Sequence, residues 1–497
     1  MNDLNKIIHV LSVEEKKSFI SHLKEKNKRH DTKNIAFFRL LDSGTSKDWE
    51  TKLYETKNRP AYNALRKRLY DNLIEFIANR DFELDYSTEK SSLKLVLAAQ
   101  TFIEKKLPEI AFKILRKAEN KALKTDAFKV LNEIYQLQIQ YAHLGVSTSL
   151  EALISKYNKN KKKVFQEEQL NLGYAYLRKQ LNNINYQGNT VDFQEIINKT
   201  IDRFNISFKD TLSFKSLYQI MFITNEYAHL NNNYYSVEDY MQKSYDEVLD
   251  KEKQIGKNRY YHILILYFMA NVFFRNRKFE LSRAYLEKML DQMNGEKAKY
   301  YITFFPKYAL LKSLNENYSG NHDLAIEMAT NTLKTNYTHS LKETSDIILV
   351  LTIFHFQKNN FKEAINVFKR LNHTDTWYEK RLGIDWCIKK NLIEILLHIE
   401  LQNIDYVVSR MISFKRRYAN HLKLKKDPGE FHFFKFVEHY LNTPELISSD
   451  KFKTDSEEIF TSSKDIFAIS FYAWLKSKIH KTDLLKTTLE LVNHNDR

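Results

Sequence analysis

Glycine, proline and cysteine are scarce in this chain of 497 residues, which contains 9 glycines, 5 prolines and 1 cysteine. Turns between strands favour glycine and proline, so this scarcity favours long helices joined by short polar turns. The single cysteine, Cys387, excludes an internal disulfide framework and a cysteine-based zinc site. The 16 histidines are scattered without metal-ligand spacing. We therefore expect an all-α protein with no metal or other cofactor.

Long apolar runs are also missing. The longest, residues 260–274, contains His262 and Asn271 and is shorter than the roughly 20 residues that a membrane span needs. The first residues, MNDLNKIIHVLSVEEKK, have neither an uninterrupted apolar segment nor a small-residue cleavage site. We expect no membrane span and a cytoplasmic, reducing location.

Catalytic motifs are absent or weak. The chain has no phosphate-binding glycine loop, no H-E-x-x-H and no serine or cysteine nucleophile in a recognisable elbow. His-Asp pairs occur at His30 and His322, as in metal-dependent phosphohydrolases, but the second falls in an expected turn. Arg416 and His421 have the R-x4-H spacing of HEPN-type ribonucleases within a segment that is simply basic. We expect a non-catalytic protein.

The stretch Tyr260–Leu290 reads as two amphipathic helices joined by a tight polar turn at residues 275–278. Its small residues, Ala270 and Ser282, would let the two helices cross closely, because bulky side chains would hold their axes apart. Neither helix can bury its apolar stripe alone, so we expect further hairpins to stack on either side.

These residues resemble the tetratricopeptide repeat (TPR), a helix–turn–helix unit with small residues on both helices and an aromatic near the turn. Ala270 and Ser282 match the small positions, and Phe273 and Phe279 match the aromatic ones. The consensus tryptophan and terminal proline are missing. The resemblance implies a right-handed α-solenoid; other helical solenoids stay open, since Ser282, Ala325 and Ala364 follow at spacings of 43 and 39 residues, against 34 in a standard TPR.

The expected organisation has three parts. Residues 1–85 form a helical domain without repeats, residues 90–420 carry the TPR-like hairpins, and residues 421–497 form a C-terminal helical cap. Hairpins are expected at about 92–122, 127–158, 211–249 and 385–420, with a first helix around Gly173 paired to one near 192–204.

Resemblance to TPRs implies that the first helices line a concave groove. Partner-binding positions in this groove would be Tyr174, Arg178, Tyr267, Asn271, Phe274 and Arg275. Asparagine can bond a peptide amide and arginine a carboxylate, which suits an extended acidic peptide. Solvation of the hairpin end is the plainer interpretation of Asn271 and Arg275.

The chain carries 16 excess positive charges, which is compatible with nucleic acid, an acidic protein or solubility alone. Candidate nucleic-acid contacts are Arg59, Arg66, Lys67, Arg68, Lys161, Lys162 and Lys163. A helix at 46–56, a turn at 57–59 and a helix at 60–79 could form a helix-turn-helix.

Two hypotheses follow. The first is a scaffold or adaptor that binds a protein or extended peptide along its groove. The alternative is a nucleic-acid-binding regulator whose N-terminal domain contacts nucleic acid and whose repeats sense a partner. The sequence indicates neither the partner nor the oligomeric state.

Overall fold

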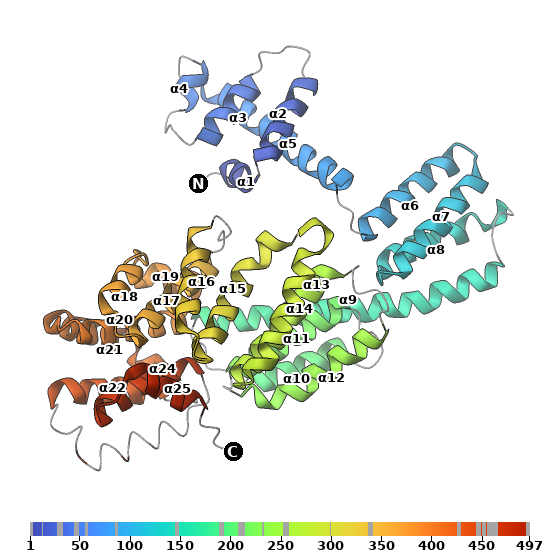
Figure 1. The fold of residues 1–497 in the computed structure, drawn as a ribbon. Helices are drawn as coiled ribbons and strands as arrows, with labels where there is room; N and C mark the ends of the chain where they lie inside the picture. Colours follow the sequence, from blue (N-terminus) through green and yellow to red (C-terminus); the bar gives the residue numbers. More distant parts are fainter. Residues whose placement is uncertain are drawn as a thin grey trace. The chain divides into compact units, whose positions relative to one another are not determined.

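The computed structural model describes residues 3–11, 13–26, 33–43, 49–54, 58–84, 88–144, 149–187, 193–206, 214–230, 233–251, 258–298, 300–335, 341–424, 429–443, 449, 454 and 466–493. Within these ranges the secondary structure is helical and no strand occurs, which confirms the all-α prediction (Figure 1). No helix in the described ranges combines the length and apolarity needed to cross a bilayer. The chain divides into two compact units, residues 1–154 and 155–497.

The first unit begins with five helices that share one core. They are α1 (Asp3–Val10), α2 (Val13–Lys26), α3 (Lys33–Ser43), α4 (Trp49–Tyr54) and α5 (Arg59–Leu84). Helix α5 buries Leu65, Leu69, Leu73 and Phe76 at helical spacing, and these pack against apolar residues of α1–α3.

Helices α6 (Thr88–Glu104) and α7 (Pro108–Leu123) form the hairpin predicted at 92–122, and α8 (Phe128–Gln140) packs beside both. The small residues Ala99, Ala111 and Ala118 are fully buried.

One prediction fails after α8 and a short 3-10 turn, η1 (Ala142–Leu144). The sequence predicts a hairpin at 127–158 and a separate helix around Gly173. In the structure, residues 150–187 form the single 38-residue helix α9 (Leu150–Gln187). Lysine and glutamate favour helix, and no proline or glycine interrupts residues 150–172. The division between the two units falls within this helix.

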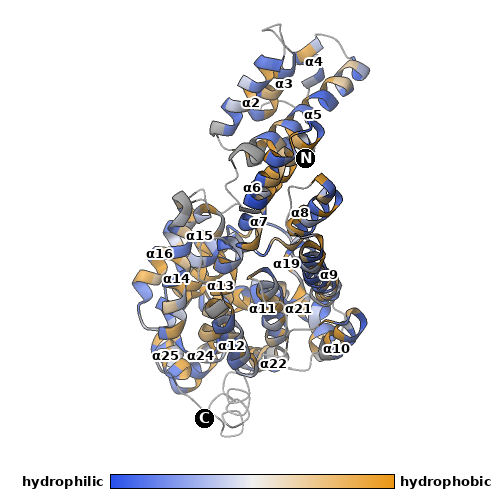
Figure 2. Cartoon of the chain, turned by 90° about the vertical axis from the view of Figure 1, so that its right-hand side faces the viewer, coloured by the Kyte–Doolittle hydropathy of each residue, from blue (hydrophilic) through white to orange (hydrophobic). Residues whose placement is uncertain are grey.

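The second unit is a succession of hairpins. From α11 to α17 each first helix packs on its second helix and on the next first helix. Helix α9 contributes Leu177 and Leu181 to a cluster with residues of α10 and α11. Around each helix, hydrophobic and hydrophilic residues alternate (Figure 2). The first helices are α9, α11 (Phe214–Leu230), α13 (Arg259–Arg275), α15 (Tyr301–Tyr318), α17 (Leu341–Gln357) and α20 (Ile384–Glu400). The second helices are α10 (Phe193–Phe204), α12 (Tyr235–Lys251), α14 (Phe279–Ala298), α16 (His322–Lys334), α18 (Phe361–Phe368) and α21 (Ile404–Leu424).

The hairpin predicted at Tyr260–Leu290 is α13 with α14, and its small residues touch. The Ser282 hydroxyl donates to the Ala270 carbonyl over 2.7 Å, and both residues are fully buried. Ala325 and Ala364 are equally buried in the next two second helices. Close helix crossing therefore recurs at the positions that the sequence marked.

The hairpin turns need few glycines, because other residues adopt the left-handed backbone conformation in several of them. Arg277, Asn359 and Gln402 each adopt φ near +60°, and Gly320 adopts φ +96° at the equivalent turn. At each, two backbone bonds close the turn, as in Lys278 N–H to the Phe273 carbonyl, 2.8 Å. This is the Schellman arrangement, in which the left-handed residue is usually glycine.

One short helix departs from the hairpin pattern. Helix α19 (Asp375–Leu382) lies between α18 and α20, with the Thr374 hydroxyl accepting from the Trp377 amide. Gly383, at φ +97°, separates α19 from α20.

After α21 come α22 (Gly429–Asn442), α24 (Ile466–His480) and α25 (Leu484–Asn493). Helix α22 packs on α21, whereas α24 and α25 return to the middle of the unit. Ile469 and Val492 belong to the core of α11–α15, and Trp474 to the core of α17–α22. Residues predicted as a C-terminal cap thus bridge several hairpins. Whether the hairpins are TPR-like and the stack right-handed stays a prediction.

Candidate functional site

A continuous series of side-chain contacts joins the first helices from α9 to α20. The Tyr174 hydroxyl of α9 lies 3.2 Å from that of Tyr218 on α11. Asn271 of α13 donates to Asn225 of α11 over 2.9 Å. Through these two contacts, polar side chains connect α9, α11 and α13. We call the complete series the ladder.

The ladder continues through charged groups. The Lys307 ammonium of α15 lies 5.8 Å from the ring centroid of Tyr267 on α13 and pairs with Glu343 of α17. The Trp386 indole of α20 donates to Asp346 of α17 over 2.8 Å. Each first helix therefore presents a polar or aromatic side chain to the next along one face.

Charged groups on this face influence one another across the row of first helices. Glu226 of α11 and Asp346 of α17 keep partial contact with solvent, yet burial raises the pKa of both carboxyls. Lys342, also on α17, lowers the pKa of Glu226 although α13 and α15 lie between their helices in the row. Charges on α11 and α17 are therefore close enough to interact across this face.

Four predicted groove residues lie on the ladder face. Tyr174, Tyr267 and Asn271 are half-exposed members of the ladder, and Arg178 is exposed with its guanidinium carbon 5.6 Å from the Tyr174 ring centroid. Arg178 also lowers the pKa of Glu226.

The other two predicted groove residues are placed differently. Phe274 is 2% exposed and packs against Phe279 and Tyr318, so its ring cannot reach a ligand. Arg275 is half-buried, with its guanidinium 5.7 Å from the Tyr234 ring centroid. The burial of Phe274 follows from the rotation of α13, whose open face carries residues 260, 267 and 271.

Sequence reasoning missed four charged residues and one aromatic residue on this face: Glu226, Lys307, Lys342, Asp346 and Trp386. A usable signal existed, because Lys307 and Asp346 are charged residues that directly precede apolar stretches of their helices. Both stand 13 residues before the left-handed turn residue of their hairpin, so aligning the repeats by their turns would have matched them.

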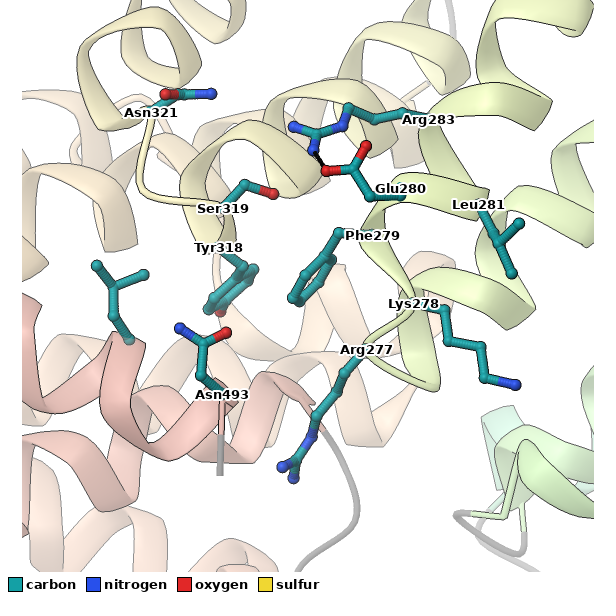
Figure 3. A pocket seen from close by; sticks show the side chains of 11 residues that line it. Arg277, Lys278, Phe279, Glu280, Leu281, Arg283, Tyr318, Ser319, Asn321 and Asn493 are labelled. Atoms are coloured by element: carbon teal, nitrogen blue, oxygen red, sulfur yellow. Dashed lines mark hydrogen bonds and ion pairs between the residues drawn. The ribbon is translucent and has the colours of Figure 1, made fainter. Parts of the chain in front are cut away.

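A second hollow lies at the hairpin turns. A cavity of about 500 Å³ is bordered by the α13–α14 turn, the α15–α16 turn and α25. Figure 3 shows Phe279 and Tyr318 beside it, with Asn493 below and Ser319 above. Lys278 points away and pairs with Glu238 over 2.5 Å, while Arg283 pairs with Glu280. Its cations are therefore largely neutralised.

The nucleic-acid candidates are all exposed. Arg59, Arg66, Lys67 and Arg68 lie on α5, and Lys161, Lys162 and Lys163 on α9. Helix α4 covers residues 49–54 of the predicted helix at 46–56, and α5 runs beyond residue 79. Residues 46–48 and 55–57 lie outside the described part.

The candidate catalytic residues contact other side chains, are exposed, or lie outside the described residues. His421 bonds Asp385 over 3.2 Å, while Arg416 is exposed on the same helix. His322 is buried, and Asp323 pairs with Lys358 over 2.5 Å. His30 and Asp31 lie outside the described residues. Among the residues described, no three metal-ligating side chains come together.

No protein-family model matches the sequence, and no curated protein is significantly similar to it.

Proposed function

We propose that this protein is a non-catalytic scaffold that binds a protein or extended peptide along the ladder face. The observation that carries the proposal is the row of contacting polar and aromatic side chains, presented by one first helix after another. Tyrosine, tryptophan and arginine, which are frequent at binding hot spots, gather on this face as Tyr174, Tyr267, Trp386 and Arg178.

The charge pattern supports a polypeptide ligand of mixed character. Arg178 and Lys342 offer cations, and Glu226 and Asp346 offer carboxylates in a partly desolvated setting. Asn271 and Asn225 add amide groups that match a peptide backbone in hydrogen-bonding capacity. TPR-like repeats in a right-handed solenoid would produce such a face, and this remains our interpretation of the fold.

The test is to identify proteins that co-purify with the full chain and to repeat the capture with Asn271→Ala combined with Lys342→Ala. We expect the variant to lose its partner, because it removes an amide and a cation from the face. The matched control is Glu287→Ala, which removes an exposed charge on α14. Retention of every partner by the double variant would refute the proposal.

A second candidate function is nucleic-acid binding by the first unit. Residues 59–68 of α5 carry four exposed cations and no acidic residue. Replacing Arg66, Lys67 and Arg68 by glutamine should weaken binding to random DNA or RNA. If all three contact phosphates, the slope of log affinity against log salt should fall by roughly 2–3. Absence of binding by the intact chain at low salt would remove this candidate.

A further inference from the structure

A second cavity, of about 660 Å³, lies between the α15–α16 turn and α25. Asp483, just before α25, and Glu490 on α25 give it two carboxylates, and Lys486 gives one ammonium. Leu485 and Leu489 form an apolar side. The lining therefore carries more negative than positive charge and is partly apolar. We call it the His322 cavity, because the first residue of α16 also borders it.

His322 is 8% exposed, and its two ring nitrogens differ. Nδ1 lies 2.8 Å from Asn317 Oδ1, and Asn317 in turn donates its amide hydrogen to Gln357 over 2.9 Å. Asn317 Oδ1 must then accept from His322, which places the ring proton on Nδ1. Nε2 is left as a lone-pair acceptor, buried and without a hydrogen-bond partner in the described chain.

The surroundings keep this imidazole neutral. Burial lowers the pKa of His322, and the charge of Lys358 lowers it further. Asp323 and Asp483 act in the opposite direction, and burial outweighs them. At neutral pH the ring therefore offers an acceptor beside carboxylates, which together suit a ligand that is both a donor and a cation.

We propose that the His322 cavity binds an alkylammonium group, donated by a lysine side chain of a partner or by a free polyamine. The ammonium would donate to Nε2 and be neutralised by Asp483 and Glu490, while its methylene chain lies against Leu485 and Leu489. An anion fits poorly, because it would face two carboxylates and the nitrogen lone pair. The site lies at the hairpin turns and is distinct from the ladder face.

The test is isothermal titration calorimetry of the full chain with two probes, 1,4-diaminobutane and the blocked peptide acetyl-Gly-Lys-Gly-amide. Binding of either probe supports the proposal, and the tighter one identifies the source of the amine. If neither binds at pH 7.5, the proposal is wrong.

Three variants localise the binding. Asp483→Asn removes a charge while keeping the side-chain oxygen that accepts from the Lys486 amide at 2.8 Å, so α25 stays capped. The double variant Asp483→Asn/Glu490→Gln should weaken amine binding about tenfold or more. Glu327→Gln, an exposed carboxylate on α16, is the matched control and should change nothing. Equal affinity in all three variants would refute the proposal.

The pH dependence separates the imidazole from the carboxylates. Binding should weaken as the pH falls through the lowered pKa of His322 and the ring becomes protonated. The charged groups around it are Asp323, Asp483, Glu490, Lys358 and Lys486. His322→Gln should flatten this dependence between pH 7.5 and 5. An unchanged pH profile in that variant would contradict the assigned role of Nε2.

Discussion

The hydroxyl of Tyr318 lies 3.0 Å from the hydroxyl of Ser470, although 152 residues separate them in the chain. Ser470 also accepts from the Gln357 amide over 3.3 Å. Tyr318 ends α15 and Gln357 ends α17, so one serine of α24 joins equivalent ends of two first helices. Glu400, which ends α20, accepts from the Trp474 indole over 2.6 Å. Helix α24 therefore runs across the ends of three successive first helices.

Replacing Ser470 by alanine should lower the free energy of unfolding by about 1–3 kcal/mol, because Tyr318 and Gln357 would lose a buried partner together. Urea unfolding of the full chain measures this. Ser319→Ala, which alters an exposed hydroxyl in the adjoining turn, should change stability by less than about 0.5 kcal/mol. Equal stability of the two variants would show that α24 does not secure the hairpins.

Contacts between helices that are adjacent in the sequence were predictable, whereas contacts between distant helices were not. The hairpin at 260–290 and the buried role of Ala270, Ser282, Ala325 and Ala364 follow from local spacing, since helices i and i+1 are neighbours in space. The return of α24 to Tyr318 was not predictable, because helical periodicity says which face is apolar but not which surface covers it. Phe274 was misplaced within the candidate groove for a related reason. Its neighbour Tyr318 lies on another hairpin, so α13 alone did not show which side was covered.

Gln402→Gly should raise stability by about 0.5–1 kcal/mol, because Gln402 adopts φ +58° at the α20–α21 turn and a side chain there is strained. Gly320→Ala should have the opposite effect, lowering stability by about 1 kcal/mol at the equivalent turn, where an added Cβ would meet open space. Thermal unfolding of both variants checks the pair. A destabilised Gln402→Gly would mean that its side chain matters more than its backbone conformation.

Lys390→Met should cost about 3–5 kcal/mol, because Lys390 lies 3.1 Å from both Asp375 and Glu394 and is 4% exposed. Lys415→Met, which breaks the exposed pair with Glu438, should cost about 1 kcal/mol or less. Burial raises the pKa of Asp375, but Lys390 and Arg410 outweigh it and hold that pKa below 3.8. Its stabilisation is thus present at pH 7 and is lost as the pH falls through the folded-state pKa. Urea unfolding of both variants measures the two losses of stability. Equal losses would show that the network of Lys390, Asp375 and Glu394 is dispensable for stability.

His262 should make the protein less stable in mild acid. It is buried, with its Nε2 2.9 Å from the Tyr245 hydroxyl, and burial lowers its pKa to about 4 from 6.5. Because the folded chain binds this proton less readily than the unfolded chain, the contribution is complete above pH 6.5 and declines as the pH falls toward 4. The loss between pH 7 and 5 should be roughly 2 kcal/mol.

His262→Phe should remove this part of the pH dependence, at the expense of an unpaired Tyr245 hydroxyl. The comparison is the difference in unfolding free energy between pH 7 and pH 5 in each protein. A variant with the full acid sensitivity of the natural chain would place the titrating group elsewhere.

The most direct test of partner binding along the ladder face is site-specific photo-cross-linking in cells that naturally contain the protein. A photo-reactive phenylalanine derivative is placed at Tyr267 on the ladder face, and in a second protein at Glu287 on the outer side of α14. Binding along the ladder face predicts protein adducts from position 267 and none from 287. Adducts from 287 with none from 267 would contradict it.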